Sequence, residues 1–444
     1  MSPMPSPFRS ATSLTAAICV FAIAACSTPG PHSGASSRNA DDSLTESAFL
    51  SRLSAAEPAA GDKPAGALLT ERAGASFYRV REAIKEAPEF QGGLPFVDFR
   101  YLYAERSELF PSADAGLEQK KAATALSLLE QEGVFAQLTA AARAPRVLEP
   151  LEGPMARPPA SRFDSFAIGE LANACRAQMR RAIVKDDAAA FIDAYERTVG
   201  LARVSSFYST LASRSLASDI GSLAYDELRS LLVLRRLDAS ELRRLAKLTS
   251  QSWSFAPYWA SLMGDYLRSR EVMAQTLAEA ELAPALRELE YITETALRSL
   301  SWETEVDAAV GRLQRAASKI PSDNLQALAY AGAAAAGFRR DADTNAQRAA
   351  VMVMIGLELQ RHELGQYPDS ISLFFDELER WNLRESASEF RYEKLGAETG
   401  DTFRRGYLLY SGVAEINRPA DVINEPVFRV WRADSATAGA DAGP

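Results

Sequence analysis

Few side chains in this sequence have the types and spacing that covalent or metal chemistry requires. The 444 residues contain three cysteines, Cys19, Cys26 and Cys175, and two histidines, His32 and His362. Zinc sites use Cys and His ligands in sets, and a hydrolytic triad needs a histidine base beside its nucleophile. We therefore expect neither a histidine-dependent hydrolase nor a zinc site, and we predict no cofactor. Chemistry that uses carboxylates alone stays open.

Cys26 is the cysteine whose surroundings predict a covalent modification. The tetrapeptide Ile-Ala-Ala-Cys at 23–26 closes an apolar run over 14–24, and Arg9 precedes that run. A basic start, a short apolar run and small residues before a cut site are the layout of a secretory signal peptide. The run has about a dozen residues, whereas a bilayer span needs roughly 20. An ordinary secretory cut beside a cysteine stays open as the alternative.

This segment resembles the signal of bacterial lipoproteins. The resemblance implies that 1–25 is removed and that Cys26 becomes the lipidated amino terminus. Ser27 follows, and in Gram-negative lipoproteins a residue other than Asp at this place goes with sorting to the outer membrane. Two or more acyl chains hold a protein stably on a bilayer, because each buried CH₂ contributes about 0.8 kcal/mol. We therefore expect a palmitate-bearing envelope protein on the periplasmic face of the outer membrane.

The composition limits the class of the mature protein. Hydrophobic residues make up 47% of the chain and charged residues 24%, as in globular proteins. The net charge of −9 becomes −10 without the signal, because Arg9 is the only charged residue in 1–25. Nucleic acids require a basic surface, so no nucleic-acid partner is expected. Cys175 lies in an apolar series of helical spacing, which favours a buried, inert thiol over a reactive one.

The chain divides into five predicted segments. The signal peptide covers 1–25, and the lipidated cysteine with a flexible tether covers 26–70. A helical body follows over 71–340, then a small α+β module over 341–432 and a disordered tail over 433–444. The fold class is mainly α. We expect an irregular antiparallel helical-hairpin body, tetratricopeptide-like in its pairing but without a fixed repeat, and the small α+β module after it.

Several element boundaries can be predicted from local patterns. A helix is expected over 163–184, with Asp186 or Asp187 as the cap of the next helix. Ser240 is the expected cap of a later helix, and Pro284 is expected to interrupt the acidic region 263–320. A helix over 344–363 should end at Gly365. Alternating residues predict strands within 389–395, 406–410 and 427–431.

The carboxy-terminal pattern resembles two groups of bacterial proteins. Residues 357–370 combine a helix end, Gly-x-Tyr-Pro and a second helix start, and 409–412 read Leu-Tyr-Ser-Gly. This resembles the helix-to-sheet module of type II secretion pseudopilins. It also resembles an uncharacterised, largely helical bacterial lipoprotein family, over roughly 120–412. A pseudopilin has a prepilin cleavage site and a long apolar first helix, whereas this chain has the Cys26 pattern. The loop 413–417 has too few carboxylates for the calcium site of many pseudopilin tails.

Four aromatic residues form the candidate partner patch, and packing between helices is the alternative: Trp253, Phe255, Tyr258 and Trp259. The arginine pairs at 235–236 and 243–244 favour a salt-bridged helix surface over a lipid or glycan site. Carboxylates between 288 and 307 favour a solvated helix face over a glycosidase pair. His362, with no Cys or second His nearby, favours an interhelical hydrogen bond or a surface role.

Two hypotheses from different classes follow, and we expect no enzyme in the favoured one. That hypothesis is a lipid-anchored, non-catalytic helical scaffold or binding module with an unknown envelope protein as its partner. The alternative is a carboxylate-dependent envelope enzyme, which would show a deep pocket with paired buried carboxylates. An accessory factor of a secretion or pilus system is a further alternative, and it rests on the pseudopilin resemblance alone.

Overall fold

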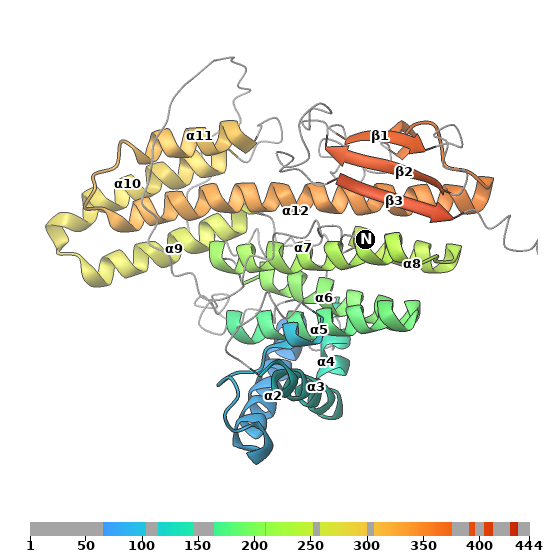
Figure 1. The fold of residues 1–444 in the computed structure, drawn as a ribbon. Helices are drawn as coiled ribbons and strands as arrows, with labels where there is room; N and C mark the ends of the chain where they lie inside the picture. Colours follow the sequence, from blue (N-terminus) through green and yellow to red (C-terminus); the bar gives the residue numbers. More distant parts are fainter. Residues whose placement is uncertain are drawn as a thin grey trace, which may run out of the picture.

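The computed structural model describes residues 65–103, 114–145, 147, 164–208, 210–251, 258–299, 306–374, 390–395, 404–411 and 427–433. Within these ranges the chain is mainly helical, as predicted (Figure 1). The α-helices there are α2 (Gly66–Glu86), α3 (Ala115–Gln131), α4 (Val134–Ala142), α5 (Ser165–Lys185), α6 (Ala188–Ser206), α7 (Leu211–Leu234), α8 (Ala239–Gln251), α9 (Tyr258–Thr276), α10 (Glu279–Arg298), α11 (Val306–Ala317) and α12 (Leu325–Leu364).

The centre of the molecule is a stack of α5, α6, α7 and α12. Short turns join α5 to α6 and α6 to α7, so these helices run antiparallel, and α7 lies alongside α12 (Figure 1). Apolar residues recur along one face of each helix and meet in a shared core. Its members include Phe191, Tyr195, Leu228, Val353 and Leu357. This stack is the frame to which the other helices attach.

Below the stack, α2, α3 and α4 form a second group, and its core is shared with residues of α5, α6 and α7 (Figure 1). Phe77, Val80 and Ile84 recur at helical spacing on α2, and each is buried. The helix ends at Glu86, and Pro88 opens the 3-10 helix η1 (Pro88–Phe90). A second 3-10 helix, η2 (Phe99–Leu102), packs against α3 and α5. The segment between η1 and η2 therefore crosses from α2 to α5.

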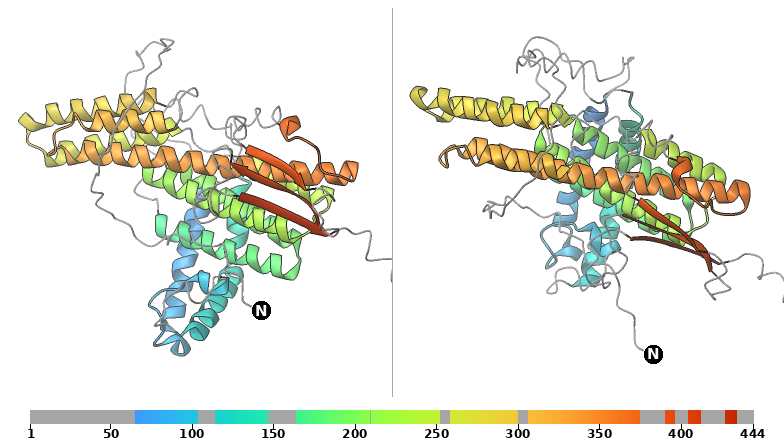
Figure 2. Two further views of the ribbon diagram at one scale, coloured as in Figure 1. Left: turned by 45° about the horizontal axis from the view of Figure 1, so that its top comes forward. Right: turned by 90° about the horizontal axis from the view of Figure 1, so that it is seen from above.

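On the other side of the molecule, α9, α10, α11 and residues 325–340 of α12 form a helical arm. Both views in Figure 2 show the arm extending beyond the central stack. It has its own core, which includes Leu262, Leu289, Ile292, Leu313 and Ala331. Tyr330 Oη donates to Leu262 O over 3.0 Å and so fixes α12 against α9.

Three strands lie near the carboxy-terminal end of α12: β1 (Phe390–Leu395), β2 (Arg404–Ser411) and β3 (Val427–Ala433). They form an antiparallel sheet in the order β1-β2-β3. Leu409 is buried in the core of the stack, and Phe390 and Tyr392 pack against that core. Tyr392 Oη donates to Pro368 O over 2.8 Å, in the turn that follows α12. A 3-10 helix, η5 (Ser372–Phe374), follows the same turn.

The break between α5 and α6 lies where the sequence predicts it. Asp186 has a φ of 58°, in the left-handed region that ends many helices. Asp187 caps α6, because its side chain accepts a hydrogen bond from Ala190 N over 2.9 Å. Arg235 donates to Ile183 O over 2.6 and 2.9 Å, so a cation satisfies a carbonyl at the end of α5.

Two predicted details of the helix boundaries are wrong. Asp238 rather than Ser240 caps α8, because its Oδ1 accepts hydrogen bonds from the backbone N–H groups of Ser240 and Glu241. Pro284 lies inside α10 and does not interrupt it. The proline stands near the start of the helix, and the buried residues Leu289 and Ile292 hold the turns that follow against the arm core.

The helix predicted over 344–363 is the second half of α12, which has 40 residues. The boundary predicted between 340 and 341 therefore falls inside a continuous helix. Some of the polar residues near this position contact α7: Arg340 pairs with Asp219, and Asp341 with Arg214. Thr344 is buried, and its Oγ1 lies 3.3 Å from Ser218 O of α7.

The predicted tether over 26–70 also ends earlier than expected. Helix α2 begins at Gly66, and Ala67, Leu69 and Thr70 are buried. Ala67 N donates to Val147 O over 2.8 Å. Residues 65–70 therefore belong to the folded body, because their small and apolar side chains pack against neighbouring segments.

Candidate functional site

Of the predicted site residues, Cys26, Trp253 and Phe255 lie outside the described residues. Tyr258 and Trp259 begin α9, where the arm meets the stack. Trp259 is half-buried and packs against the arm core.

Tyr258 is a packing residue at the base of the arm. It is 9% exposed, and its ring stacks on Phe338 with 5.0 Å between the centroids. Its hydroxyl donates to Ala334 O over 3.3 Å. Burial raises the pKa of that hydroxyl well above its usual range. Tyr258 therefore joins α9 to α12 and offers no open surface to a partner, so the packing alternative holds for this residue.

An ion pair beside Tyr258 joins the stack to the arm. Arg214 of α7 donates to both carboxylate oxygens of Asp341 on α12, with Nε to Oδ1 at 2.8 Å and Nη2 to Oδ2 at 2.9 Å. The two side chains are 5% and 17% exposed. Ser218 Oγ donates to the same carboxylate over 3.3 Å, and the Arg214 guanidinium lies 5.6 Å from the centre of the Tyr258 ring. We call these four residues the arm junction.

A second polar cluster lies where η2 meets α5, and it contains a pair of carboxylates. Asp98 is 5% exposed and caps η2 by accepting from Arg100 N over 3.0 Å. The Arg100 guanidinium also donates to both oxygens of Asp98. Glu170 of α5 accepts from Asn173 Nδ2 over 3.3 Å. Burial and the negative charge of Asp98 raise the pKa of Glu170 to about 7.

The cluster continues along α5 toward α7. Glu227 of α7 is fully buried and forms ion pairs with Arg176 and Arg180 of α5, the first with 2.7 Å between Nε and Oε1. The Arg176 guanidinium lies 5.0 Å from the centre of the Tyr103 ring. Burial raises the pKa of Tyr103 to about 12. A buried carboxylate between two arginines is compensated electrostatically, so this part fixes α5 to α7.

Proton exchange is the chemistry that this second cluster can supply. A carboxyl group with a pKa near 7 changes protonation close to neutral pH, which is the property of general acids and bases. Tyr103 keeps its proton at that pH, and Arg100 and Arg176 place positive charge nearby. The same features also occur in structural ion-pair networks, so the cluster alone does not define an enzyme.

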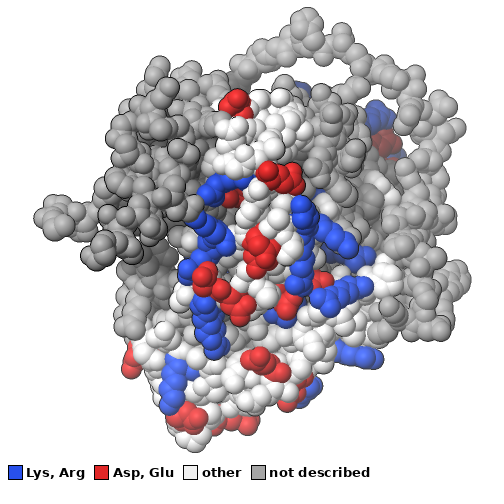
Figure 3. All heavy atoms as spheres, turned by 90° about the vertical axis from the view of Figure 1, so that its right-hand side faces the viewer, with Lys and Arg blue, Asp and Glu red and all other residues white. Residues whose placement is uncertain are grey.

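The predicted basic pairs form a salt-bridged surface at the end of the stack. Figure 3 shows that face, where Lys and Arg side chains lie among Asp and Glu side chains. Arg235 pairs with Asp186, Arg243 with Glu363, and Arg244 with Asp193 and Glu196. The mixture of signs confirms the salt-bridged interpretation for these three arginines.

Other predicted roles can be checked in the described residues. Cys175 is fully buried, and burial raises the pKa of its thiol to about 11, which confirms an inert thiol. His362 Nε2 donates to Leu237 O over 2.6 Å, which confirms a hydrogen-bonding role. Glu288 and Glu290 are half-buried and accept hydrogen bonds from Asn324 and Tyr266, so they are less solvated than predicted.

The described ranges contain no cluster of three or more His, Cys, Asp or Glu side chains arranged as a metal site. No helix in those ranges is both long and apolar enough to cross a bilayer. Comparison of the chain with protein-family models, with curated proteins and with solved structures gave no match. The functional interpretation therefore rests on the residues of this chain.

Sequence reasoning missed the second cluster, although a signal for it exists. Glu170 stands between Ile168 and Leu171, and Glu227 stands between Tyr225 and Leu228, on otherwise apolar helix faces. A charge at a core position requires a partner, because an unpaired buried charge is very costly. That rule marks Glu227 as a paired residue, but it does not name Arg176, which is 51 positions away.

Proposed function

We propose that this chain is a lipid-anchored protein of the bacterial envelope that binds a protein partner through its helical arm. The observation that carries the binding role is the arm itself, which extends beyond the stack on a helix shared with it (Figure 2). Large apolar side chains on the arm are exposed: Val272 by 38%, Tyr291 by 42% and Leu325 by 71%. Exposed apolar and aromatic side chains are typical anchors of protein interfaces.

The anchor at Cys26 is the second part of the proposal. Its support is the Ile-Ala-Ala-Cys pattern after a short apolar run, which resembles lipoprotein signals. In this proposal the lipid holds the molecule at the periplasmic face of the outer membrane and leaves the arm to reach its partner. No catalytic step is assigned.

The finer fold class belongs to the same proposal. We infer a tetratricopeptide-like pairing of helices, supported by the antiparallel succession α5–α6–α7. We also infer a pseudopilin-like module at the carboxy terminus, in the manner of the uncharacterised lipoprotein family that the sequence resembles. Its support is the turn after α12, where Tyr367 Oη donates to Glu358 Oε1 over 2.8 Å, together with the three strands that follow.

Site-specific photocrosslinking in cells tests the arm and the anchor together. A photoreactive residue is placed at Tyr291 or at Val272 on the arm, and at Val184 as a matched exposed position on α5, which is 79% exposed. We expect one discrete adduct from the arm positions and none from Val184. The same adduct should weaken in the Cys26→Ser variant, because that variant cannot receive the thioether-linked lipid.

The binding arm and the anchor can be contradicted separately. Identical adducts from Val184 and from the arm, or adducts with abundant envelope proteins alone, would exclude a specific binding arm. A Cys26→Ser protein that still sediments with envelopes and carries as much fatty acid would exclude the anchor.

A carboxylate-dependent enzyme is the second candidate function, and the Asp98–Glu170 pair is the observation that favours it. The pKa of Glu170 near 7 suits proton transfer. The sequence-based criterion was a deep pocket with paired buried carboxylates. Neither Asp98 nor Glu170 lines the cavity between α2 and the loop joining η1 to η2, which is described below. We therefore rank this function second.

A further inference from the structure

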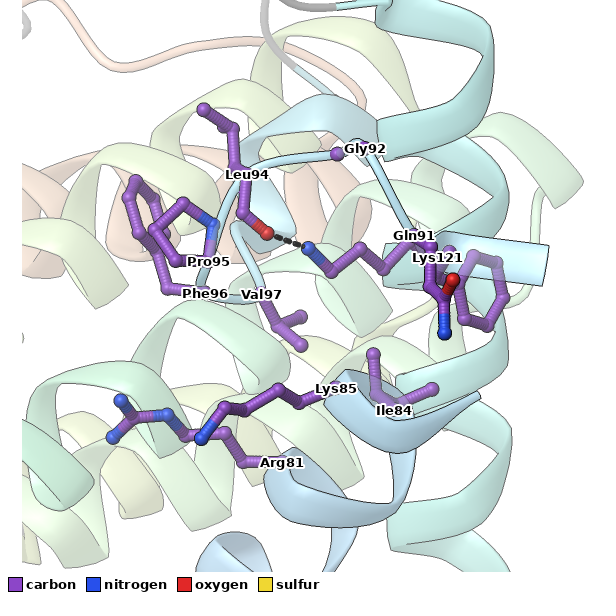
Figure 4. A pocket seen from close by; sticks show the side chains of 12 residues that line it. Arg81, Ile84, Lys85, Gln91, Gly92, Leu94, Pro95, Phe96, Val97 and Lys121 are labelled. Carbon is purple, nitrogen blue, oxygen red and sulfur yellow. Dashed lines mark hydrogen bonds between the residues drawn. The ribbon is translucent and has the colours of Figure 1, made fainter. Parts of the chain in front are cut away.

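A small cavity lies between the end of α2 and the loop that joins η1 to η2 (Figure 4). Its volume is about 160 Å³. An engineered cavity of about 150 Å³ is known to hold one benzene molecule, so this one is large enough for a small organic ligand. The cavity is separate from the arm and from the arm junction.

The loop over the cavity is fixed by a buried pair of opposite charges on α3. Glu118 Oε1 accepts from Leu94 N over 2.7 Å, and Lys121 Nζ donates to Leu94 O. The two side chains are 1% and 4% exposed. A Cβ at Gly93 would collide with the Glu118 carboxylate, so glycine permits this close approach. Because both backbone groups of Leu94 are held, the cavity is formed before any ligand binds.

The lining combines positive charge with apolar surface. Three cationic side chains, Arg81, Lys85 and Lys121, line the cavity, and no Asp or Glu does. In Figure 4, Arg81 and Lys85 extend from α2 in the same direction, and Lys121 reaches Leu94 above them. The apolar part is contributed by Ile84, Phe90, Leu94, Pro95, Phe96 and Val97. A ligand that fits this lining carries a negative group on an apolar body.

Arg81 is the cation best placed to bind such a ligand. Its guanidinium lies 5.3 Å from the ring centre of Phe166 and 5.9 Å from that of Tyr78, so aromatic rings hold it in position. Among the described residues no carboxylate forms an ion pair with Arg81, and its buried Nε has no hydrogen-bond partner there. The charge of Arg81 acts on the Glu170 carboxylate, but no carboxylate among the described residues is hydrogen-bonded to it. A partly buried guanidinium with free donors is stabilised when an anion supplies paired hydrogen bonds.

The other two cations have different roles. Lys121 is already engaged by Leu94 O and Glu118, so it supports the loop. Lys85 is 61% exposed and pairs with Glu82 over 3.2 Å at the surface. Such exposed pairs are weak, so Lys85 can turn toward a bound anion at little cost.

From these observations we propose that the cavity binds a small organic carboxylate, with Arg81 as the main contact of the carboxylate group and Lys85 as a second cation. A planar guanidinium matches a carboxylate with two parallel hydrogen bonds. The apolar residues of the loop then cover the organic part. This inference goes beyond the proposed binding arm and does not depend on it.

Calorimetric titration of the full-length protein in detergent with benzoate tests the inference. Benzoate fits the size of the cavity and carries a carboxylate on an apolar ring, as the lining requires. Benzamide has the same ring but no charge, so it is the matched neutral probe. We expect benzoate to bind with a Kd below about 1 mM and benzamide to bind at least about 10-fold more weakly. Inorganic phosphate serves as a third probe, because it carries charge without an apolar body.

Variants on α2 identify the contact. Arg81→Gln should weaken benzoate binding about 10-fold or more. Arg81→Lys should weaken it less, because lysine keeps the positive charge. Arg79→Gln is the control, since Arg79 is exposed on the same helix, pairs with Glu132 and does not line the cavity. Its affinity should stay within about 2-fold of wild type. Thermal unfolding of each variant shows whether α2 remains folded.

Several outcomes would overturn the inference. Equal binding of benzoate and benzamide would remove the charge requirement. Equal losses in Arg81→Gln and Arg79→Gln would place the carboxylate elsewhere. Binding of phosphate but not of benzoate would show that the cavity takes an inorganic anion and not an organic carboxylate. No binding at benzoate concentrations up to about 10 mM would exclude the site.

Discussion

Glu170 lies on α5 between apolar residues, so little water reaches its carboxylate. Its pKa rises from the ordinary 4.5 to about 7, chiefly because of burial and then because of the charge on Asp98. Between these two pH values the folded protein binds more protons at Glu170 than the unfolded chain does. The free energy of unfolding therefore falls as the pH rises from about 4.5 to about 7.

The variant Glu170→Gln should flatten this pH dependence. We expect the change in unfolding free energy between about pH 5 and about pH 7.5 to shrink by roughly 1–3 kcal/mol, because each pKa unit corresponds to about 1.4 kcal/mol. Urea unfolding at the two pH values measures it. Glu82→Gln, at an exposed carboxylate of α2, is the control. Equal pH dependence in Glu170→Gln and wild type would show that the Glu170 pKa is not raised.

Residue roles could be predicted from sequence where the cause is local. Asp187 caps α6 through an N–H group only three positions away, and Cys175 is buried because its own helix face is apolar. Glu170, Glu227 and Arg81 could not be assigned in this way. Their environments are set by side chains on other segments, such as Phe166 for Arg81, and sequence alone does not give those pairings.

At the scale of the element, glycine marks where two helices touch. Gly200 on α6 faces α4, and a Cβ added there would lie 2.6 Å from Ala142 Cα. Gly332 on α12 is exposed, and nothing lies within 4 Å of the corresponding position. The two glycines therefore have opposite roles, although both are inside helices.

Alanine at these two positions should change stability in opposite directions. Gly200→Ala should destabilise the protein by about 1–3 kcal/mol, because α4 and α6 must move apart. Gly332→Ala should stabilise it by roughly 0.5–1 kcal/mol, because alanine lowers the entropy cost of forming the helix. Urea unfolding compares both with wild type. A neutral Gly200→Ala would show that α4 does not contact α6 closely.

Element prediction worked where breaks have strong local signals and failed where polar residues serve long-range contacts. Gly365 ends α12 and Asp187 caps α6, as predicted. The boundary predicted between 340 and 341 falls where polar residues make contacts with another helix: Arg340 pairs with Asp219 and Asp341 with Arg214, both on α7. A helix whose polar residues face another helix has the same local pattern as a linker.

On the scale of the whole molecule, the arm junction determines how the arm is attached. Asp341→Asn removes the charge that compensates the nearly buried Arg214. Breaking a buried ion pair costs about 3–5 kcal/mol. We expect the free energy of unfolding, measured in urea, to fall by that amount. Relative to wild type, amide hydrogen exchange should speed up more in α9 than in α5, because the lost ion pair lies at the base of the arm.

Asp343→Asn is the matched control, since Asp343 lies on the same helix and is exposed. Its effect should stay within about 0.5 kcal/mol. Equal losses in the two variants, or equally faster exchange in α5 and α9, would show that Asp341 does not hold the arm.

The mainly helical class follows from apolar spacing, but the arrangement of the whole molecule does not. The described residues form three apolar clusters, and helices of the stack contribute residues to each of them. The sharing of a core by two helices depends on contacts between residues far apart in sequence. The rings of Tyr258 and Phe338, for example, stack although they are 80 positions apart. For the same reason the sequence did not reveal the cavity, whose lining joins α2, the loop and α3.

The continuity of α12 has a mechanical consequence. At about 1.5 Å per residue, its 40 residues form a rod of roughly 60 Å. Bending it where the arm leaves the stack would break several backbone hydrogen bonds at once. The arm therefore keeps a constant orientation. A force applied at the tip of the arm is transmitted along α12 to the turn at Gly365, at the opposite end of the helix.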